Sequence, residues 1–350
     1  MAMIAVKDVV FFELYRDFFD LYLPKQRGCS PHTRKAYKTA MDDLLDFIKA
    51  EKNIQFADIT FATIDSAMLT AFLDSIEEGG CSIATRNHRL ASIRAFYKYA
   101  AKVEPLAVAY RAEIMKVPIK KSNKVEVVRY MTMGEVKSVL DQPDPTTKLG
   151  LRNQFILLMF YDTGARISEI RRIKVRDVKL GKQPTVKLFG KGRKERIVPI
   201  AEKTAEHFIN YLSVFHPGAA QYSEDYLFYV EHQGRKDPIG ETTVRDMMKK
   251  YCAAARGKGD EAPDRIYPHL WRHSRSMHLY QHGMDLTLLS QWLDHANLET
   301  TLIYAHADTE HKRKAIEAAV PDDSPMKQFA DPARFYIDDD EQLRRLYGLR

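Results

Sequence analysis

The sequence predicts a mostly α-helical protein of two domains, with a small antiparallel β-sheet in the second. Its 350 residues exceed what one compact domain usually holds. Apolar residues recur with a helical period after Ser30 and again after Ser82. Strict alternation is confined to 185–200, where TVKLF and ERIVPI flank a Gly-Lys-Gly turn. Helices are therefore expected almost throughout, with one clear hairpin.

Residues 1–112 are expected to form an all-helical domain. A short amphipathic helix covers 11–23, Ser30 caps a second helix, a third covers 64–78, and Ser82 caps a fourth. Basic side chains on the second and fourth helices suggest contact with a phosphate backbone, although composition favours a solvated surface equally. These candidate DNA-binding residues are Arg34, Lys35, Lys38, Arg86, Arg89 and Arg94.

A basic linker over 113–129 joins this domain to a second domain over 130–320, and 321–350 form a tail. Linkers of this composition often follow a duplex, so two of its residues are DNA-binding candidates, Lys120 and Lys121. A capping box of Thr132 and Glu135 opens the second domain. Its further expected elements are an apolar helix over 151–164, helices near 203–215, 241–256 and 309–319, a strand over 225–230, and a short tail helix over 340–349.

Composition restricts the class of partner. The formal charge is +7, and residues 116–320 hold 34 Lys and Arg against 25 Asp and Glu. Such a basic body indicates a polyanionic partner, with nucleic acid first. Three scattered cysteines without a CxxC pair indicate neither a disulfide framework nor a cysteine zinc site. No run approaches the roughly 20 apolar residues of a membrane span, so we expect a cytoplasmic protein without a membrane partner.

The segment from His269 to Tyr304 concentrates the residues that a phosphate chemistry needs. Phosphodiester exchange without a metal requires a nucleophile, a charge clamp on the non-bridging oxygens, a proton acceptor and a proton donor. A guanidinium suits the clamp because its planar fork binds phosphate oxygens bidentately. Arg272 and Arg166 are the candidates. Glu169, one turn after Arg166, would orient it, and the alternative is that the two simply form a structural pair.

The hairpin turn supplies a candidate proton donor. Lys191 lies between two glycines and can extend into a groove, and a lysine gives up a proton more readily than an arginine. A solvated turn is the plain alternative. Neighbouring basic residues of the hairpin are interpreted as DNA-backbone contacts, namely Arg193, Lys194 and Arg196.

Four histidines spaced in pairs raise the question of a metal. His269 and His273 are four residues apart, as are His278 and His282, and this spacing suits zinc on a helix. No glutamate lies within either pair and no carboxylate cluster supplies further ligands, so no metal is expected. His295, at a helix end, is a catalytic candidate or an ordinary capping histidine.

Taken together, these motifs resemble the tyrosine recombinase family, which includes phage integrases and Xer-like recombinases. TGARISEI, FGKGRKERIVPI, HLWRHS and WLDHANLETTLIYAH are similar to its catalytic boxes, in the family's order. The segments SPHTRKAYKTAMDDLLDFI and TRNHRLASIRAFYKYA resemble its helical, SAM-like core-binding domain. The resemblance implies a core-binding domain and a mixed α/β catalytic domain that form a C-shaped clamp on DNA. It assigns the catalytic residues Arg166, Lys191, His269, Arg272, His295 and Tyr304.

The mechanism that the resemblance implies needs neither metal nor other cofactor. Tyr304 attacks the scissile phosphate and forms a 3′-phosphotyrosyl link, while the arginine clamp and His295 stabilise the transition state. His269 accepts the tyrosine proton, and Lys191 protonates the leaving 5′-hydroxyl. The implied partners are double-stranded DNA with recombination sites and three further protomers in a tetramer. Accessory recombinases or DNA-bending proteins are possible additions.

One residue departs from the family pattern. The family usually has glycine before the second histidine of the last box, and this chain has Asp294. Aspartate tolerates a left-handed backbone better than most residues, so the turn is expected to form, with a carboxylate that weakens phosphate binding.

Three functions remain open from the sequence. The first is a site-specific recombinase, either the integrase of a mobile element or a Xer-like resolvase. The second is a type IB topoisomerase, which shares the nucleophile and the clamp. The third is a non-catalytic DNA-binding regulator. The core-binding motifs and the tail, which would contact a neighbouring protomer or remain a disordered tail, favour the first.

Overall fold

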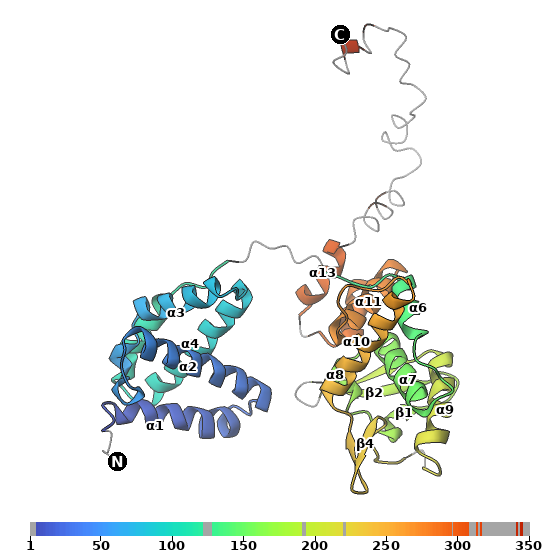
Figure 1. The fold of residues 1–350 in the computed structure, drawn as a ribbon, viewed down its shortest axis with the longest axis horizontal. Helices are drawn as coiled ribbons and strands as arrows, with labels where there is room; N and C mark the ends of the chain where they lie inside the picture. The colour runs from blue at the N-terminus through green and yellow to red at the C-terminus, as the bar shows by residue number, and fades with distance from the viewer. Residues whose placement is uncertain are drawn as a thin grey trace. The chain divides into compact units, whose positions relative to one another are not determined.

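The computed structural model describes residues 5–121, 128–190, 194–219, 222–295 and 297–307, with five single residues beyond. The chain divides into two compact units, Met1–Val125 and Glu126–Arg350. Each has its own hydrophobic core (Figure 1). In the described residues, no helix is both long enough and apolar enough to cross a membrane.

The first unit is all-helical, as the sequence predicts. Ser30 and Ser82 cap their helices by accepting hydrogen bonds from the backbone N–H groups of Thr33 and Thr85. Its elements are α1 (Val9–Asp17), the π-helix η1 (Phe18–Gln26), α2 (Pro31–Glu51), the 3₁₀ turns η2 (Phe56–Asp58) and η3 (Phe61–Thr63), α3 (Ser66–Glu78), α4 (Ile83–Val103) and α5 (Ala107–Lys116).

Aromatic rings fill the core of the first unit. Phe96 of α4 packs edge-on against Phe11 and Phe18, with ring centroids 5.7 and 5.6 Å apart. Ile114 and Val117 belong to the same core, and α5 therefore continues the helical unit past residue 112.

Several basic residues expected on the outer faces have structural partners instead. Arg86 is only 5% exposed, and its Nε lies 3.2 Å from Glu77 Oε2. Arg94 donates to the carbonyls of Met115 and Val117. Arg86 and Arg94 thus bind α4 to neighbouring segments, which a helical pattern does not reveal, and a DNA contact for either residue stays a prediction.

The remaining basic candidates divide into paired and exposed side chains. Arg89 forms an ion pair with Asp43, and Lys120 forms one with Glu77 at 2.6 Å. Arg34 is half-buried. Lys35, Lys38 and Lys121 are exposed, as is Lys120, and all six residues remain predictions as DNA contacts.

The second unit surrounds a small sheet with helices. Its elements are α6 (Met133–Leu140), α7 (Lys148–Thr163), α8 (Ile167–Ile170), the 3₁₀ turn η4 (Val175–Asp177), β1 (Val178–Lys179), β2 (Thr185–Phe189), β3 (Glu195–Pro199), α9 (Glu202–Phe215), β4 (Tyr229–His232), β5 (Arg235–Pro238), α10 (Glu241–Gly257), α11 (Pro268–Gln281), α12 (Leu286–Leu293) and α13 (Glu299–Ala307). The apolar helix α7 packs against both α9 and α11, and its Phe155 and Phe160 are fully buried.

Strands β1, β2 and β3 form an antiparallel sheet in that order, with Leu188 opposite Arg196. The predicted hairpin of β2 and β3 is therefore confirmed. The strand expected over 225–230 lies later, in β4, and pairs with β5 across Gln233 and Gly234, which both have positive φ. A two-residue turn of this kind matches the twist of a hairpin, but neither residue type is distinctive enough to reveal it.

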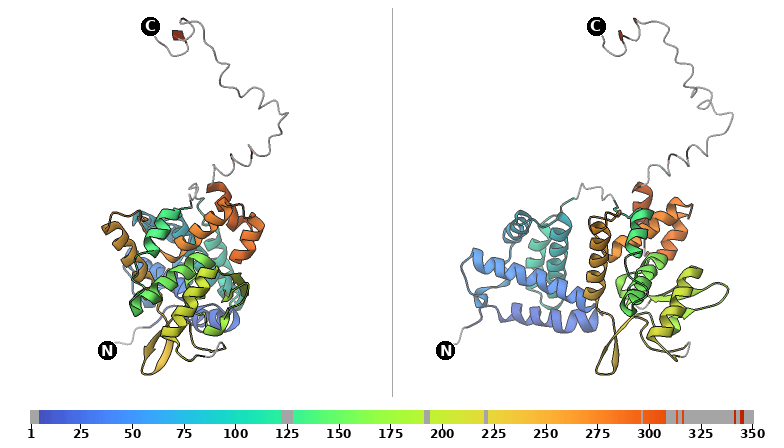
Figure 2. Two further views of the ribbon diagram at one scale, coloured as in Figure 1. Left: turned by 90° about the vertical axis from the view of Figure 1, so that its right-hand side faces the viewer. Right: turned by 45° about the vertical axis from the view of Figure 1, so that its right-hand side comes forward.

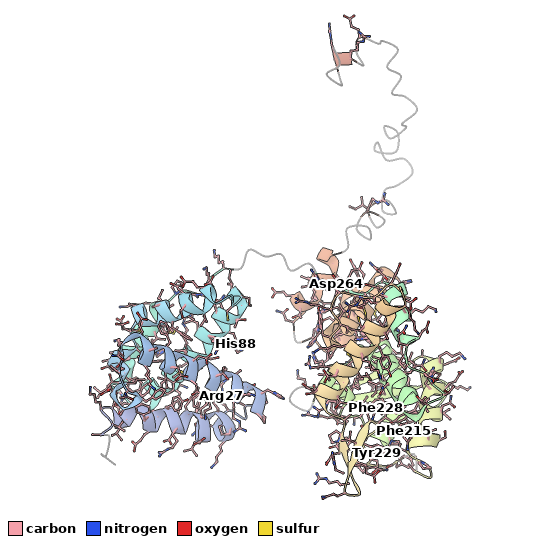
Figure 3. All side chains as sticks on the ribbon, in the orientation of Figure 1. Arg27, His88, Phe215, Phe228, Tyr229 and Asp264 are labelled. Atoms are coloured by element: carbon pink, nitrogen blue, oxygen red, sulfur yellow. The ribbon has the colours of Figure 1, made fainter. Side chains whose placement is uncertain are left out.

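The β4–β5 hairpin extends away from the helices of its unit, as Figure 2 shows. At its base Tyr229 donates a hydrogen bond of 2.7 Å to the carbonyl of Phe215, and Phe228 lies close by (Figure 3). The expected helices over 309–319 and 340–349 fall largely outside the described residues.

Candidate active site

Arg166 is placed by a sharp turn at the end of α7. Gly164 ends that helix in the left-handed region, with φ 54°, and a Cβ there would lie 2.6 Å from the ring of Trp292. Arg166 then caps α8. Its backbone N–H donates to Glu169 Oε2 at 2.8 Å, and its Nη1 donates to Oε1 at 2.9 Å. The predicted pairing is present, and it fixes the guanidinium at the edge of the core.

The buried guanidinium of Arg272 is hydrogen-bonded to backbone carbonyls. The side chain is 3% exposed, and it donates to the carbonyls of Gly164, at 2.8 Å, and of Leu293. Burial, followed by repulsion from Arg166 and Arg196, lowers its pKa to about 9. A guanidinium that remains buried among like charges is well placed to gain an anionic partner.

The two predicted histidines join the same cluster. His295 follows α12, and its Nδ1 forms a 2.8 Å hydrogen bond with the hydroxyl of Thr301. Burial, with repulsion from Arg272 and Arg166, lowers the pKa of His295 to about 4. Partial desolvation and the same two arginines lower the pKa of His269. The four side chains thus share one electropositive region, as an anion site requires.

Arg196 has hydrogen-bond partners within its own unit. Its side chain is 9% exposed, and its Nη2 lies 2.9 Å from Glu169 Oε2. Its Nη1 donates to the carbonyl of Trp292. The guanidinium thus points into the protein rather than into solvent in the DNA-free chain, and a DNA-backbone contact for Arg196 stays a prediction. An alternating strand pattern assigns each side chain to one face of the sheet. It does not show whether a cation on that face lies beside a buried carboxylate, as Arg196 lies beside Glu169.

Asp294 adopts the left-handed conformation expected of it, with φ 51° and ψ 50° at the end of α12. Its Oδ2 lies 3.2 Å from the position that a Cβ on Gly190 would occupy, and Glu169 Oε1 lies 3.5 Å from it. Two carboxylates therefore approach the base of the β2–β3 turn, and a Cβ at Gly190 would press on that of Asp294. Lys191 and Arg193 lie outside the described residues, whereas Lys194 is exposed.

Tyr304 is buried rather than presented to solvent. It belongs to a small apolar cluster with Met277, Leu289 and Leu293, and its hydroxyl is hydrogen-bonded to His273 Nδ1 at 3.0 Å. Burial raises the pKa of Tyr304, against the opposing effects of Ser276 and Arg272. The candidate nucleophile therefore lies near Arg272, but its hydroxyl is hydrogen-bonded to His273 and not to a residue of the arginine–histidine cluster.

His273 is the residue that sequence reasoning missed. It was considered only as a possible zinc ligand, although it follows Arg272 directly and lies one turn after His269. Burial, followed by repulsion from His269 and Arg272, lowers its pKa to about 4. Among the residues that the structure describes, no group of three or more His, Cys, Asp or Glu side chains is arranged to hold a metal ion.

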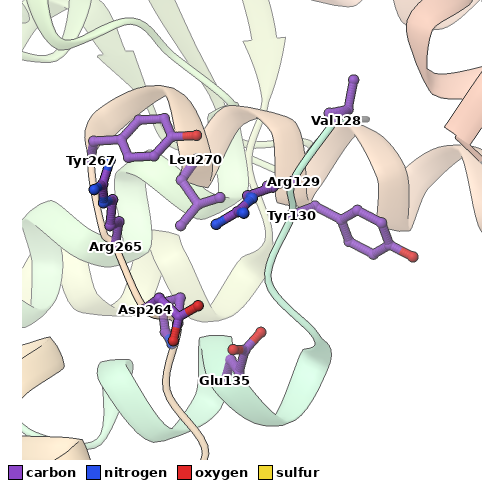
Figure 4. Close-up of a pocket in the computed structure, with 9 residues that line it drawn as sticks. Val128, Arg129, Tyr130, Glu135, Asp264, Arg265, Tyr267 and Leu270 are labelled. Carbon is purple, nitrogen blue, oxygen red and sulfur yellow. The ribbon is translucent and has the colours of Figure 1, made fainter. Parts of the chain in front are cut away.

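A cavity of about 810 Å³ opens beside the N-terminus of α11. Tyr267 and Leu270 line one side, and Arg129 and Tyr130 line another (Figure 4). Its charged residues are of both signs, since Glu135, Asp264 and Arg265 also reach it. Unlike the arginine–histidine cluster, this cavity is not built for an anion alone.

Comparison with known proteins identifies the family of the chain. Residues 129–311 match the model of the phage integrase family, and residues 17–103 match its N-terminal SAM-like domain. The chain is 32% identical, over 90% of its length and 93% of the other, to the putative integrase/recombinase y4rC of Sinorhizobium fredii. It is 27% identical to tyrosine recombinase XerC of Thermodesulfovibrio yellowstonii, over 88% and 97% of the two chains.

Solved structures share the fold. The XerH site-specific recombinase, in a post-cleavage complex with a palindromic difH substrate, matches with a TM-score of 0.65 and 21% identity over 91% of each chain. The Tn1549 transposon integrase in complex with circular intermediate DNA matches with a TM-score of 0.61 and 19% identity, over 89% of this chain and 99% of the other.

The chain belongs to the phage integrase family, that is, to the tyrosine recombinases. It is a site-specific DNA recombinase, and a topoisomerase-like activity is not favoured.

Proposed function

We propose that Tyr304 is the nucleophile and that the cluster around Arg272 binds the scissile phosphate. The phenolate oxygen forms a bond to phosphorus while the bond from phosphorus to the 5′-oxygen breaks, leaving a 3′-phosphotyrosyl link. The proton of the tyrosine passes to a histidine, and Lys191 supplies a proton to the departing 5′-oxygen. Attack by the 5′-hydroxyl of a second duplex reverses these bonds, so the joining step needs no external energy source.

One observation supports this proposal above the others. Arg166, the pair His269 and Arg272 on α11, and His295 come from three separate parts of the sequence, yet each arginine lowers the pKa of both histidines. Neighbouring guanidinium groups repel each other, and a bound anion relieves that repulsion. A phosphate in this position would turn the repulsion into attraction and would stabilise the charge that develops in the transition state.

The proposed partner is double-stranded DNA carrying two recombination sites, held by the helical and catalytic units as a clamp. We place the helical unit, residues 1–112 with the linker to 129, on the DNA backbone and residues 130–320 at the scissile phosphate. Four protomers would assemble on two duplexes, with 321–350 as an inter-protomer contact. Accessory DNA-bending proteins or a second recombinase are further candidates, and the site of action would be the nucleoid in the cytoplasm.

The biological role proposed is integration and excision of a mobile element or Xer-like resolution. The relatives carry names of both kinds: a putative integrase/recombinase in one case and XerC in another. A phosphate-binding arginine cluster suits either role, because integration and resolution both begin with cleavage of one DNA strand.

The nucleophile is tested with a pool of nicked duplexes of randomised sequence, in which cleavage next to the nick releases a short strand and leaves protein attached to DNA. Tyr304→Phe is expected to keep DNA binding and to form no covalent complex. Tyr222→Phe is the matched control, because Tyr222 is 82% exposed and should be trapped at the wild-type level. Persistent trapping of Tyr304→Phe would remove Tyr304 from this role.

A further inference from the structure

Three arginines bind consecutive backbone carbonyls at the C-terminal end of α12. Carbonyls at a helix end lack partners within the helix and carry the negative end of its dipole, so they attract cations. The arginines come from the turn after α7, from strand β3 and from helix α11, and they converge on the residues just before His295. The three pairs are Arg166 with Asp294, Arg196 with Trp292, and Arg272 with Leu293.

Two of the three arginines belong to the proposed phosphate clamp, and Arg196 does not. Its guanidinium joins the carboxylate of Glu169 to the carbonyl of Trp292. Glu169 has no exposed side-chain surface and also holds Arg166. Arg196 is therefore the link between the residue that orients Arg166 and the turn that carries His295.

We propose that Arg196 is a positioning residue for the cleavage reaction, acting through Glu169 on Arg166 and through Trp292 on His295. This inference rests on the proposed function of the clamp. It also ties the clamp to the β2–β3 hairpin, because Arg196 lies in β3 opposite Leu188. A displacement of the hairpin would move Arg196, and with it the clamp.

The chemistry of Arg196 favours positioning over plain stabilisation. A buried ion pair contributes little net stability, since desolvation offsets the attraction. Nε of Arg196 is also buried and has no hydrogen-bond partner within the described part of the chain, which adds to the unfavourable side. A planar fork does fix the relative position of two acceptors, which an apolar side chain of equal size does not do.

The test compares Arg196→Met, Arg196→Lys and a control, Lys187→Met, on the duplex most enriched in the trapping pool. Lys187 lies in the same hairpin, and its side chain is 37% exposed. We expect Arg196→Met to lower the covalent trapping rate by about 100-fold, the loss typical of small misplacements. Arg196→Lys should lose less, because an ammonium keeps the pair with Glu169, and Lys187→Met should trap at close to the wild-type rate.

Two readouts distinguish a positioning role from a direct phosphate contact and from a general loss of structure. The salt dependence of DNA binding should not change in Arg196→Met, whereas loss of a phosphate contact would reduce its slope by about one. On a duplex with a neutral methylphosphonate at the scissile position, the difference from wild type should shrink to less than about tenfold, because one charged oxygen is absent and the clamp has less charge to neutralise.

Each other result overturns the inference. A wild-type rate in Arg196→Met, a reduced salt slope, or an equal loss on the phosphodiester and the methylphosphonate would each exclude a positioning role. Failure of the wild-type protein to be trapped at all would instead contradict the proposed function, so the two failures are distinguishable.

Discussion

The hydroxyl of Tyr304 and Nδ1 of His273 are 3.0 Å apart, inside an apolar cluster between α11 and α13. A fully buried phenol cannot be reached by a DNA phosphate, so the attack proposed for Tyr304 requires α13 to shift first. The proton acceptor that the family resemblance implies is His269, but the histidine bonded to the phenol in this structure is His273. We interpret the arrangement as a resting position of the nucleophile.

Replacing His273 should loosen that resting position. His273→Phe leaves the buried phenol without its partner, which is unfavourable by about 1–3 kcal/mol. We expect faster hydrogen–deuterium exchange in residues 299–307 of the DNA-free protein. His282→Phe is the control, since the His282 ring bonds a carbonyl of α11 itself, that of His278, and not the phenol of Tyr304. Equal exchange in the two variants would show that the hydrogen bond does not hold α13.

Substitution of Gly164 should lower the free energy of unfolding more than substitution of Gly218, another glycine with positive φ. Gly164→Ala requires a left-handed alanine, at about 1 kcal/mol, and brings its Cβ to 2.6 Å from the Trp292 ring. We expect a total loss of more than about 2 kcal/mol in the free energy of unfolding. Gly218→Ala has only the backbone cost, because a Cβ there meets nothing within 4 Å. Chemical denaturation measures the free energy of unfolding of both variants. Similar losses in Gly164→Ala and Gly218→Ala would contradict the contact with Trp292.

Acid should destabilise the DNA-free protein through the histidine cluster. The pKa of His295 is lowered to about 4 in the folded state, whereas an unfolded histidine titrates near about 6.5. Between these values the unfolded chain binds more protons, so stability falls as the pH drops from 6.5 towards 4. Melting temperatures at pH 7.5 and 5.5 should differ less in His295→Gln than in the wild type. An unchanged difference in melting temperature would show that burial and the arginines do not lower the pKa of His295.

The same cluster predicts proton uptake on DNA binding. A phosphate among the arginines offsets their repulsion and raises the pKa of His295 and His269. Calorimetric titration of a random-sequence duplex at pH 5.5, in buffers of different ionisation enthalpy, should show protons taken up. Proton release, or none in either direction, would argue that the phosphate binds elsewhere.

The carboxylate of Asp294 should weaken DNA binding. Asp294→Asn keeps a residue that tolerates the left-handed conformation and removes only the charge. We expect tighter binding of a random-sequence duplex by up to about 1 kcal/mol, with little change in unfolding. Asp294→Gly should bind equally well, because it also lacks the carboxylate. Weaker binding by Asp294→Asn would mean that the carboxylate supports the site.

Much of the site could be predicted from sequence because it is carried by local motifs. The spacing around Arg166, the hairpin at Lys191 and the segment from His269 to Tyr304 each specify residue types in a fixed order. Side-chain partners could not be predicted in the same way. Arg86 and Arg196 look like solvated cations in their helix and strand patterns, and only the fold brings a carboxylate to each, that of Glu77 to Arg86 and that of Glu169 to Arg196.

The placement of Tyr304 shows the same limit. No helix over 299–307 is predicted from the sequence, and whether the hydroxyl of Tyr304 faces the arginine–histidine cluster or His273 depends on how α13 packs against α11. That packing is decided by Met277, Leu289 and Leu293, which come from two other helices. No pattern within α13 itself contains this information.

The identity of the residue attached to DNA tests the central claim most directly. Protein trapped on a nicked duplex would be digested with nuclease and protease, and the peptide that retains a nucleotide would be sequenced by mass spectrometry. We predict a single modified peptide with the phosphate on Tyr304, formed equally well in the presence of EDTA. Modification of any other residue would contradict the account.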